Sequence, residues 1–263
     1  MKNVKIAGIV NVTPDSFSDG GVFFSPKDAI RYSLEILEKG VDIVDIGGES
    51  TRPGSAEVSA EEELRRTIPV IKGILKESSE AIISIDTYKS EVAKVAIDEG
   101  ASIVNDVSGG TFDSDMWKVV ANTKAKYILM HTPGKPSVMQ QMTSYNDPVE
   151  DVKNWLMAKA RSAVQTGVSE VIIDPGIGFG KTMEQNLQII SNIQCFVNHG
   201  FEVLIGLSRK SFIGELLGVE TSARDFPSTL YEFYSAINGV DYIRTHNINN
   251  ALKLRKIVSS LNV

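Results

Sequence analysis

Polar and charged side chains stand at or just after the short apolar runs of this sequence, where strands would end. Three of them, Asp86, Asn105 and Asp174, carry carboxylate or amide groups. A carboxylate can accept two parallel N–H hydrogen bonds, so these groups suit a flat heterocycle with an amidine-like edge. A second set is cationic and suits phosphate. Its members are Arg52, Lys210, Arg244 and His246. Together the two sets fit a heterocycle joined to a phosphate or diphosphate.

The residues that follow the other apolar runs are polar as well. Together they are stronger evidence for a functional site than any one of them alone. Alone, Asn11 or Asp86 would more often be a turn former or a helix cap. Every apolar run is nevertheless followed by a polar, charged or proton-handling group. The remaining exit residues include Asp45, Glu49, Asp106, His131 and Ser208. If the runs are parallel strands of one sheet, these groups converge on one opening and indicate a functional site.

The segment DPGIGFGKT, residues 174–182, resembles a phosphate-binding loop but fails its spacing. The Walker pattern requires a glycine five residues before Gly180, and Pro175 stands there. Its glycines do not follow the dinucleotide-binding fingerprint either. A tight turn between a strand and a helix is an equally good interpretation, and both stay open at this point.

The segment NVTPDSFSDGG, residues 11–21, raises a different question because it is longer than a turn requires. Proline, aspartate, serine and glycine favour tight backbone geometry. They do not explain eleven such residues in a row with Phe17 as the single aromatic among them. The composition therefore indicates a loop with a function of its own.

Eight short apolar runs alternate with helical patterns, which predicts eight βα units. Helical spacing is clear after Pro26 and again after Ser59, where Glu62 stands three residues on as in a capping box. Short strands rich in isoleucine and valine indicate a parallel sheet that is covered on its other face. We predict a (β/α)8 TIM barrel with its site at the C-terminal ends of the strands, and a doubly wound sheet as the alternative. The runs are 4–10, 41–46, 81–85, 102–105, 125–130, 170–174, 202–207 and 241–244.

Composition places the chain among ordinary globular proteins. Its 263 residues, with 42% hydrophobic and 23% charged side chains, suit one domain over 1–263. The net charge of −6 argues against a nucleic-acid partner or an anionic membrane surface. No run is long enough to span a membrane, and the first residues do not read as a signal peptide. Cys195 is alone, so we expect a core residue and a cytoplasmic protein. The histidines show no metal-ligand spacing, and His199 is expected at a helix end.

Seven segments occur in the order and spacing that are found in dihydropteroate synthases, and the chain resembles this family from Ile6 to Asn250. The segments are NVTPDSFSDGG, DIGGESTRPGS, SIDTYK, NDVSGG, DPGIGFGK, GLSRKSF and RTHN. The resemblance implies a barrel of the pterin-binding type. It also implies condensation of 6-hydroxymethyl-7,8-dihydropterin diphosphate with 4-aminobenzoate to 7,8-dihydropteroate and diphosphate, with Mg²⁺ and as a homodimer. Sulfonamides would compete with the aminobenzoate.

The resemblance also implies a role for individual positions. Asp174 would bind the 2-amino and N3–H edge of the pterin, and Asn105 would bond the ring. The rest of the pterin pocket would be Asp86, Met130, Phe179, Gly206 and Lys210. The diphosphate would meet Asn11, Thr51, Arg52, Arg244 and His246, with Asn11 also touching the metal. The aminobenzoate would enter between Phe17, Thr51, Pro53 and Phe179, with its carboxylate near Ser211 at a helix N-terminus.

In the mechanism that the resemblance implies, diphosphate departs once its charge is neutralised. The aromatic amine then attacks the exocyclic carbon of a pterin cation that Asp19 steadies. Residues 11–21 would be a lid that orders when diphosphate is bound, with residues 47–55 as its partner.

Three positions depart from the family pattern. They are Thr132 after the LMH segment, Asn247 after RTH, and the bulky helix STLYEFYSAING in a region that often helps the dimer. Two alternatives stay open beside the synthase. One is a non-catalytic pterin-binding subunit, and the other is a methyltransferase of the same superfamily with a corrinoid partner.

Overall fold

The chain forms a closed barrel of eight parallel strands in the order β1 to β8. The computed structural model describes residues 4–13, 25–52 and 54–261. The prediction of a (β/α)8 barrel is therefore confirmed, and the doubly wound alternative is wrong because β8 pairs with β1. The strands are β1 Lys5–Asn11, β2 Ile43–Gly47, β3 Ile83–Asp86, β4 Ile103–Asp106, β5 Lys126–Met130, β6 Val171–Asp174, β7 Glu202–Gly206 and β8 Tyr242–Thr245.

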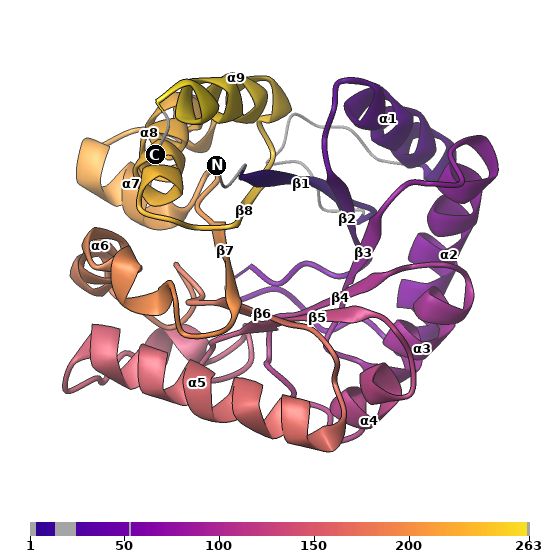
Figure 1. Cartoon of the computed structure of the whole chain (residues 1–263), viewed down its shortest axis with the longest axis horizontal. Helices are drawn as coiled ribbons and strands as arrows, with labels where there is room; N and C mark the ends of the chain where they lie inside the picture. Colours follow the sequence, from indigo (N-terminus) through magenta and orange to yellow (C-terminus); the bar gives the residue numbers. More distant parts are fainter. Residues whose placement is uncertain (1–3, 14–24, 53, 262–263) are drawn as a thin grey trace.

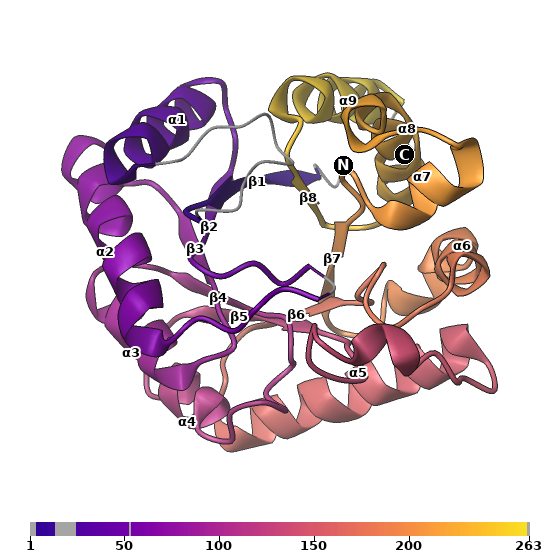
Figure 2. The same ribbon diagram turned by 180° about the vertical axis from the view of Figure 1, so that it is seen from behind.

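Helices follow the strands and surround the barrel, as Figures 1 and 2 show from the two sides. The α-helices are α1 Pro26–Glu38, α2 Ala60–Glu77, α3 Ser90–Asp98, α4 Met116–Ala121, α5 Pro148–Thr166, α6 Met183–Ser191, α7 Ser211–Leu217, α8 Asp225–Ile237 and α9 Ile248–Ser260. Short 3-10 helices are η2 Met139–Gln141, η3 Ile193–Phe196 and η4 Thr221–Ala223. Among the described residues, no helix is both long and apolar enough to cross a membrane.

The helix starts follow local capping chemistry. The Ser59 side chain accepts a hydrogen bond from the Glu62 amide at the start of α2, as predicted. Ser25 caps α1 in the same way, and Pro26 occupies the first turn, where its missing N–H costs no helical bond. Asn247 caps α9 by accepting from the Asn250 amide, so the departure from the family pattern still supplies a cap.

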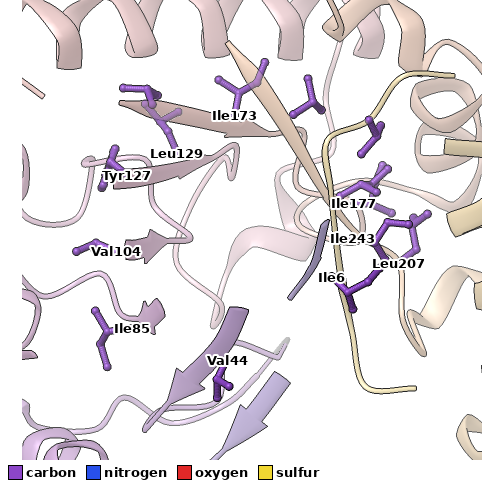
Figure 3. Packing of buried hydrophobic residues seen from close by; sticks show 14 of the residues in the cluster. Ile6, Val44, Ile85, Val104, Tyr127, Leu129, Ile173, Ile177, Leu207 and Ile243 are labelled. Atoms are coloured by element: carbon purple, nitrogen blue, oxygen red, sulfur yellow. The ribbon is translucent and has the colours of Figure 1, made fainter. Parts of the chain in front are cut away.

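Side chains of each strand alternate between the barrel interior and the helices. The outward residues, such as Val44, Ile85 and Ile173, pack in the large core cluster between the strands and the helices (Figure 3). The inward residues form a second, separate cluster that fills the barrel. It contains Ala7, Ile43, Ile103, Ile128, Ile172, Leu204 and Tyr242. The interior is thus a packed layer, and anything bound by the barrel must lie beyond it.

The next inward position lies two residues further along each strand, because side chains alternate with a period of two. Four of the seven side chains at that level are polar or charged, namely Asp45, Asn105, Asp174 and Arg244. Ile103 is followed by Asn105, and Ile172 is followed by Asp174. Strand pairing then aligns Asp86 with Asn105. The barrel itself therefore carries a polar layer towards the C-terminal ends of its strands.

Two minor predictions concern residues away from this layer. Cys195, in η3, is partly buried and packs against the main core, as expected. His199 is exposed in the connection that follows η3 and leads into β7.

Candidate active site

A cavity of about 390 Å³ opens at the C-terminal ends of the strands. A smaller hollow adjoins it and shares five of its lining residues, namely Thr51, Phe179, Gly206, Lys210 and Arg244. The larger cavity is also lined by Asn11, Arg52, Asp86, Ser211 and His246, and the smaller one by Asn105, Met130 and Asp174. Every predicted site residue that the structure describes therefore lies at one opening. Phe17, Asp19 and Pro53 lie outside the described residues, and so does most of the predicted lid.

Arg244 lies on the floor of the cavity between two carboxylates. Its Nε donates to Asp45 and its Nη2 donates to Asp86, each at 2.5 Å. Asn105 Nδ2 also donates to Asp45, at 3.2 Å. Asp45 is buried and links the amide and cationic sets. The sequence placed Asp45 at a strand exit but gave it no role, because its partners are distant in the chain.

Asp86 carries a buried oxygen atom, Oδ1, that has no hydrogen-bond partner in the described part of the chain. Burial raises the pKa of Asp86 to about 7, while the Arg244 guanidinium opposes that rise. A buried carboxylate oxygen is costly to leave unpaired, so this atom favours a ligand that donates an N–H.

Asp174 is held by the turn that follows β6. Its Oδ1 accepts from the Gly176 amide at 2.7 Å, and burial raises its pKa. Gly176 has a φ of +67°, and a Cβ there would lie 2.0 Å from the carbonyl oxygen of His131. Only glycine fits this backbone and this contact. The DPGIGFGKT segment is accordingly a tight strand-to-helix turn.

Lys210 lines both the larger cavity and the smaller hollow. Its Nζ lies 4.2 Å from the centroid of the Phe179 ring, which is cation–π geometry. Burial lowers the pKa of Lys210 to about 8, and the nearby Asp174 carboxylate opposes this shift. Met130 packs in a small cluster with Phe179 and Tyr88, which makes it part of the cleft wall.

His246 and Asn11 lie on the side of the cavity that faces β1 and β8. His246 Nδ1 lies 3.1 Å from the Ser208 hydroxyl, which fixes the orientation of the ring. A Cβ at Gly47 would lie 3.4 Å from Asn11 Oδ1 and 3.8 Å from Asp86 Oδ2. Asn11 Oδ1 and Asp86 Oδ2 thus both border the space beside Gly47. Within the described ranges, no group of three His, Cys, Asp or Glu side chains is placed to hold a metal.

A buried ionic network supports the segment between β2 and α2, which carries Thr51 and Arg52. Lys89 forms ion pairs with Glu49 and with Glu63, the second at 2.6 Å. The Tyr88 hydroxyl donates to Glu49 at 2.7 Å. In Figure 2 the segment passes across the barrel opening. The network holds its base against α2 and α3.

Two further cations lie near the opening. Sequence reasoning missed Arg224, which lines the cavity from the residue before α8. Its guanidinium packs on Gly214 of α7, where a Cβ would lie 2.3 Å from Nη2. Arg209 was expected at a strand exit without a role; it lines the cavity and forms a forked pair with Asp225, at 2.6 and 3.0 Å. No local pattern marks Arg224 or the partner of Arg209, because these contacts join distant segments.

The model of the family described as pterin binding enzyme matches residues 7–246. The chain belongs to the pterin-binding enzyme family. The match runs from β1 to the exit of β8, so it includes every cavity-lining residue described above.

Similar pterin-binding proteins are named dihydropteroate synthases, as the sequence resemblance predicts. The dihydropteroate synthase of Synechocystis is 41% identical over 263 residues, which are 99% of this chain and 91% of the relative. A Xanthomonas albilineans dihydropteroate synthase solved with 4-aminobenzoic acid has a TM-score of 0.91 at 36% identity, and covers 99% of this chain and 94% of its own. A Yersinia pestis enzyme in a sulfonamide drug complex has a TM-score of 0.94 at 33% identity, with the same two coverages.

Proposed function

We propose that this chain is a dihydropteroate synthase. It condenses 6-hydroxymethyl-7,8-dihydropterin diphosphate with 4-aminobenzoate, and it releases diphosphate in folate biosynthesis. The observation that carries this proposal is the polar layer at the barrel opening, where buried carboxylates and the cations Lys210 and Arg244 line adjoining cavities. Forked acceptors suit the pterin edge, and cations suit its diphosphate.

The pterin ring binds at the smaller hollow. Asp174 accepts from the 2-amino and N3–H edge, and Asn105 bonds the ring. The unpartnered Oδ1 of Asp86 accepts a further ring N–H. Phe179, Met130 and Gly206 form walls of this hollow, which supports a flat ligand.

The cations drive the first chemical step. Arg52, Arg244 and His246 line the larger cavity, where they neutralise the departing diphosphate. The bond between the exocyclic carbon and the diphosphate oxygen breaks, and its electron pair leaves with the diphosphate. A cation delocalised over the pterin remains, which Asp19 steadies. The amine of the aminobenzoate attacks this carbon and then loses a proton, so no covalent enzyme intermediate forms.

The aminobenzoate lies between Phe17, Thr51, Pro53 and Phe179. Its carboxylate lies near Ser211, at the start of α7. Arg224 lines the same cavity and packs on α7, which supports an anion at this end. A sulfonamide competes for this position, and the sulfonamide drug complex of the similar Yersinia pestis enzyme supports this part of the proposal.

Mg²⁺ is the cofactor of this proposal. Asn11 Oδ1 would hold it, with Asp86 close by and the substrate phosphates as further ligands. Mg²⁺ usually binds one or two protein oxygens together with substrate phosphates, which fits this donor set. When bound, it would add positive charge beside the diphosphate.

A homodimer and a cytoplasmic location complete the proposal. Large apolar side chains on α8 support the dimer, since Phe226 is 67% and Leu230 is 54% exposed. The absence of a second cysteine to pair with Cys195 supports a reducing compartment. Light scattering of the wild type and of Phe226→Asp tests the dimer: a monomeric wild type contradicts it.

The experiment that tests the function mixes both substrates with Mg²⁺ and follows diphosphate release. The wild type should release diphosphate when 4-aminobenzoate is present. Without 4-aminobenzoate, release should be slow, because water then attacks in its place. Asp174→Asn should lose most of this activity. Tight pterin binding without any release would favour the non-catalytic subunit. Methyl transfer to a corrinoid protein would favour the methyltransferase.

A further inference from the structure

The ammonium group of Lys181 lies buried behind the wall of the cavity. The residue is 4% exposed and closes the turn that begins at Asp174. Its Nζ donates to the carbonyl oxygens of Gly176 and Phe179, at 2.9 and 3.0 Å. It also lies 3.1 Å from Nδ1 of His131. An ammonium has three donors, and here all three meet an acceptor.

The three acceptors belong to the exits of two neighbouring strands. His131 follows β5, whereas Gly176 and Phe179 follow β6. The His131 amide also donates to the carbonyl oxygen of Asp174, at 2.9 Å. Lys181 therefore cross-links the two exits from inside, at the level of the substrate groups.

Burial opposes a charge on both side chains. It lowers the pKa of Lys181 to about 7, although the nearby Asp174 carboxylate raises it. It lowers the pKa of His131 to about 2, and the Lys181 charge lowers it further. His131 is thus neutral, and in the tautomer with the proton on Nε2 its Nδ1 accepts from the ammonium. The ring also packs edge-on against Trp155, with centroids 5.0 Å apart, which holds it in place.

One residue, Gly176, connects the ammonium to the Asp174 carboxylate through its two adjoining peptide groups. The carbonyl of Gly176 accepts from Lys181, and the N–H of Gly176 donates to Asp174 Oδ1 at 2.7 Å. A displacement of the ammonium would move the Gly176 backbone and the carboxylate that it holds. The second carbonyl, that of Phe179, belongs to the residue whose ring covers Lys210.

We propose that Lys181 is a positioning residue for the pterin half of the site, which fixes the Asp174 carboxylate and the Phe179 ring without touching a substrate. This inference rests on the proposed function and adds a residue to it. The lysine of the DPGIGFGKT segment, Lys181, then stabilises the turn and does not bind a substrate. Its donors are all used inside the protein, so binding of phosphate is left to the cations that line the cavity.

If Lys181 only filled space, a side chain of similar size should replace it without loss of pterin affinity. Methionine has nearly the length of lysine and would occupy the same space. It would remove the lysine donor from two carbonyls and one imidazole nitrogen, which is unfavourable and lets the turn shift. The Gly176 carbonyl would keep the Phe179 amide as a donor, at 3.1 Å. The Lys181→Met variant therefore separates a filling role from a positioning role.

The test compares binding of 6-hydroxymethylpterin and of inorganic diphosphate with Mg²⁺ to the wild type and to Lys181→Met. Residues that orient metal ligands by hydrogen bonds lower the metal affinity by about tenfold or more when they are replaced. By analogy, the pterin affinity of Lys181→Met should fall by about tenfold or more. Diphosphate affinity should stay within about twofold, since a substitution far from that end has little effect. A general loss of structure would lower the affinities for pterin and for diphosphate together.

A matched control exists on the same two strands. Lys126 forms an ion pair with Glu170 at 2.5 Å and joins β5 to the start of β6 at the opposite end of the barrel. Lys126→Met removes a cation that also links these strands, and both affinities should stay within about twofold. Circular dichroism and thermal unfolding confirm that each variant is folded.

Pterin affinity of Lys181→Met within about twofold of the wild type would overturn the inference. If that variant does not fold, Lys181→Leu replaces it, because leucine also has no donor. A folded Lys181→Leu with wild-type pterin affinity would overturn the inference equally, whereas a selective loss supports it. A wild type that binds no pterin contradicts the proposed function, and the inference with it.

Discussion

The Nε atom of Arg244 lies 2.5 Å from a carboxylate oxygen of Asp45, although 199 positions separate the two residues in the chain. Closure of the barrel makes this contact possible, because β2 and β8 are the two neighbours of β1. The same carboxylate accepts from Asn105. Asp45 therefore connects Asn105, which is proposed to bind the pterin, to Arg244, which is proposed to meet the diphosphate.

The first prediction concerns this connection. Asp45→Asn keeps the shape of the side chain but removes the charge that orients Arg244. Hydrogen bonds to charged groups contribute about 1.5–3 kcal/mol, so kcat/KM for the pterin diphosphate should fall by roughly tenfold or more. Steady-state kinetics of diphosphate release measure this.

Asp42→Asn is the control for Asp45→Asn. Asp42 also pairs with an arginine, Arg255, at 2.7 Å, but it lies at the start of β2, away from the cavity. Its kcat/KM should match that of the wild type. Unchanged kcat/KM in Asp45→Asn would show that Arg244 needs no orientation from Asp45.

The fold and most of the opening could be predicted from the sequence because both follow the strand period. The apolar runs gave the strands. Residues two positions beyond the inward apolar layer, such as Asn105 after Ile103, gave the polar groups of the site. The substrates themselves came from the family resemblance, since side-chain types alone indicate only a heterocycle with a phosphate.

The missed features all depend on contacts between distant segments. The partners of Asp45 lie on β4 and β8, and Arg224 reaches the cavity only because it packs on α7. The role of Lys181 was equally hidden, because its acceptors include His131 of the neighbouring strand exit. Local patterns contain no information on such pairs.

The second prediction concerns the network under Thr51 and Arg52. Lys89→Met leaves Glu49 and the buried Glu63 without their cation. Removal of one partner of a buried ion pair costs about 3–5 kcal/mol of folding free energy. The base of the β2–α2 segment should then shift, which raises the KM for 4-aminobenzoate by several-fold while the pterin affinity changes little. Kinetics and urea unfolding measure the two effects.

Lys72→Met serves as its control. Lys72 lies on α2, as Glu63 does, and pairs with Glu99 after α3 at 2.8 Å, but its side chain is 56% exposed. Exposed pairs contribute at most about 1 kcal/mol, so both readouts should remain near wild type. Equal KM values in Lys89→Met and Lys72→Met would exclude a role of the network in aminobenzoate binding.

The third prediction is a pH dependence that arises from Lys210. Burial lowers its pKa to about 8, so the ammonium loses its proton as the pH rises through that value. Lys210 lines both cavities, and in the proposed reaction its charged form would bind the pterin diphosphate better than the neutral amine. Since kcat/KM reports groups of the free enzyme, it should decline on the alkaline side with a midpoint near that pKa. Lys210→Arg, which stays charged, should remove this limb, and persistence of the limb in Lys210→Arg would assign it to another group.

The fourth prediction concerns stability and a buried acid away from the cavity. Glu232 of α8 is 1% exposed, and its Oε1 has no hydrogen-bond partner among the described residues. Burial raises its pKa to about 8, against a hydrogen bond from Thr245 that lowers it. The folded protein therefore favours the neutral acid, whereas the unfolded chain favours the carboxylate at neutral pH.

The sign of the effect follows from this difference. At a pH below the pKa of Glu232 in the unfolded chain, both states hold the proton, and Glu232 does not change the free energy of unfolding. Between that pKa and about 8, only the folded state holds the proton, so the free energy of unfolding falls as the pH rises. Glu232→Gln cannot ionise, so at pH above that range it should be more stable than the wild type, by up to about 5 kcal/mol. Urea unfolding on both sides of the range measures this, with the exposed Glu61→Gln as the control. Parallel stability curves for Glu232→Gln and the wild type would show that Glu232 is already compensated in the folded state.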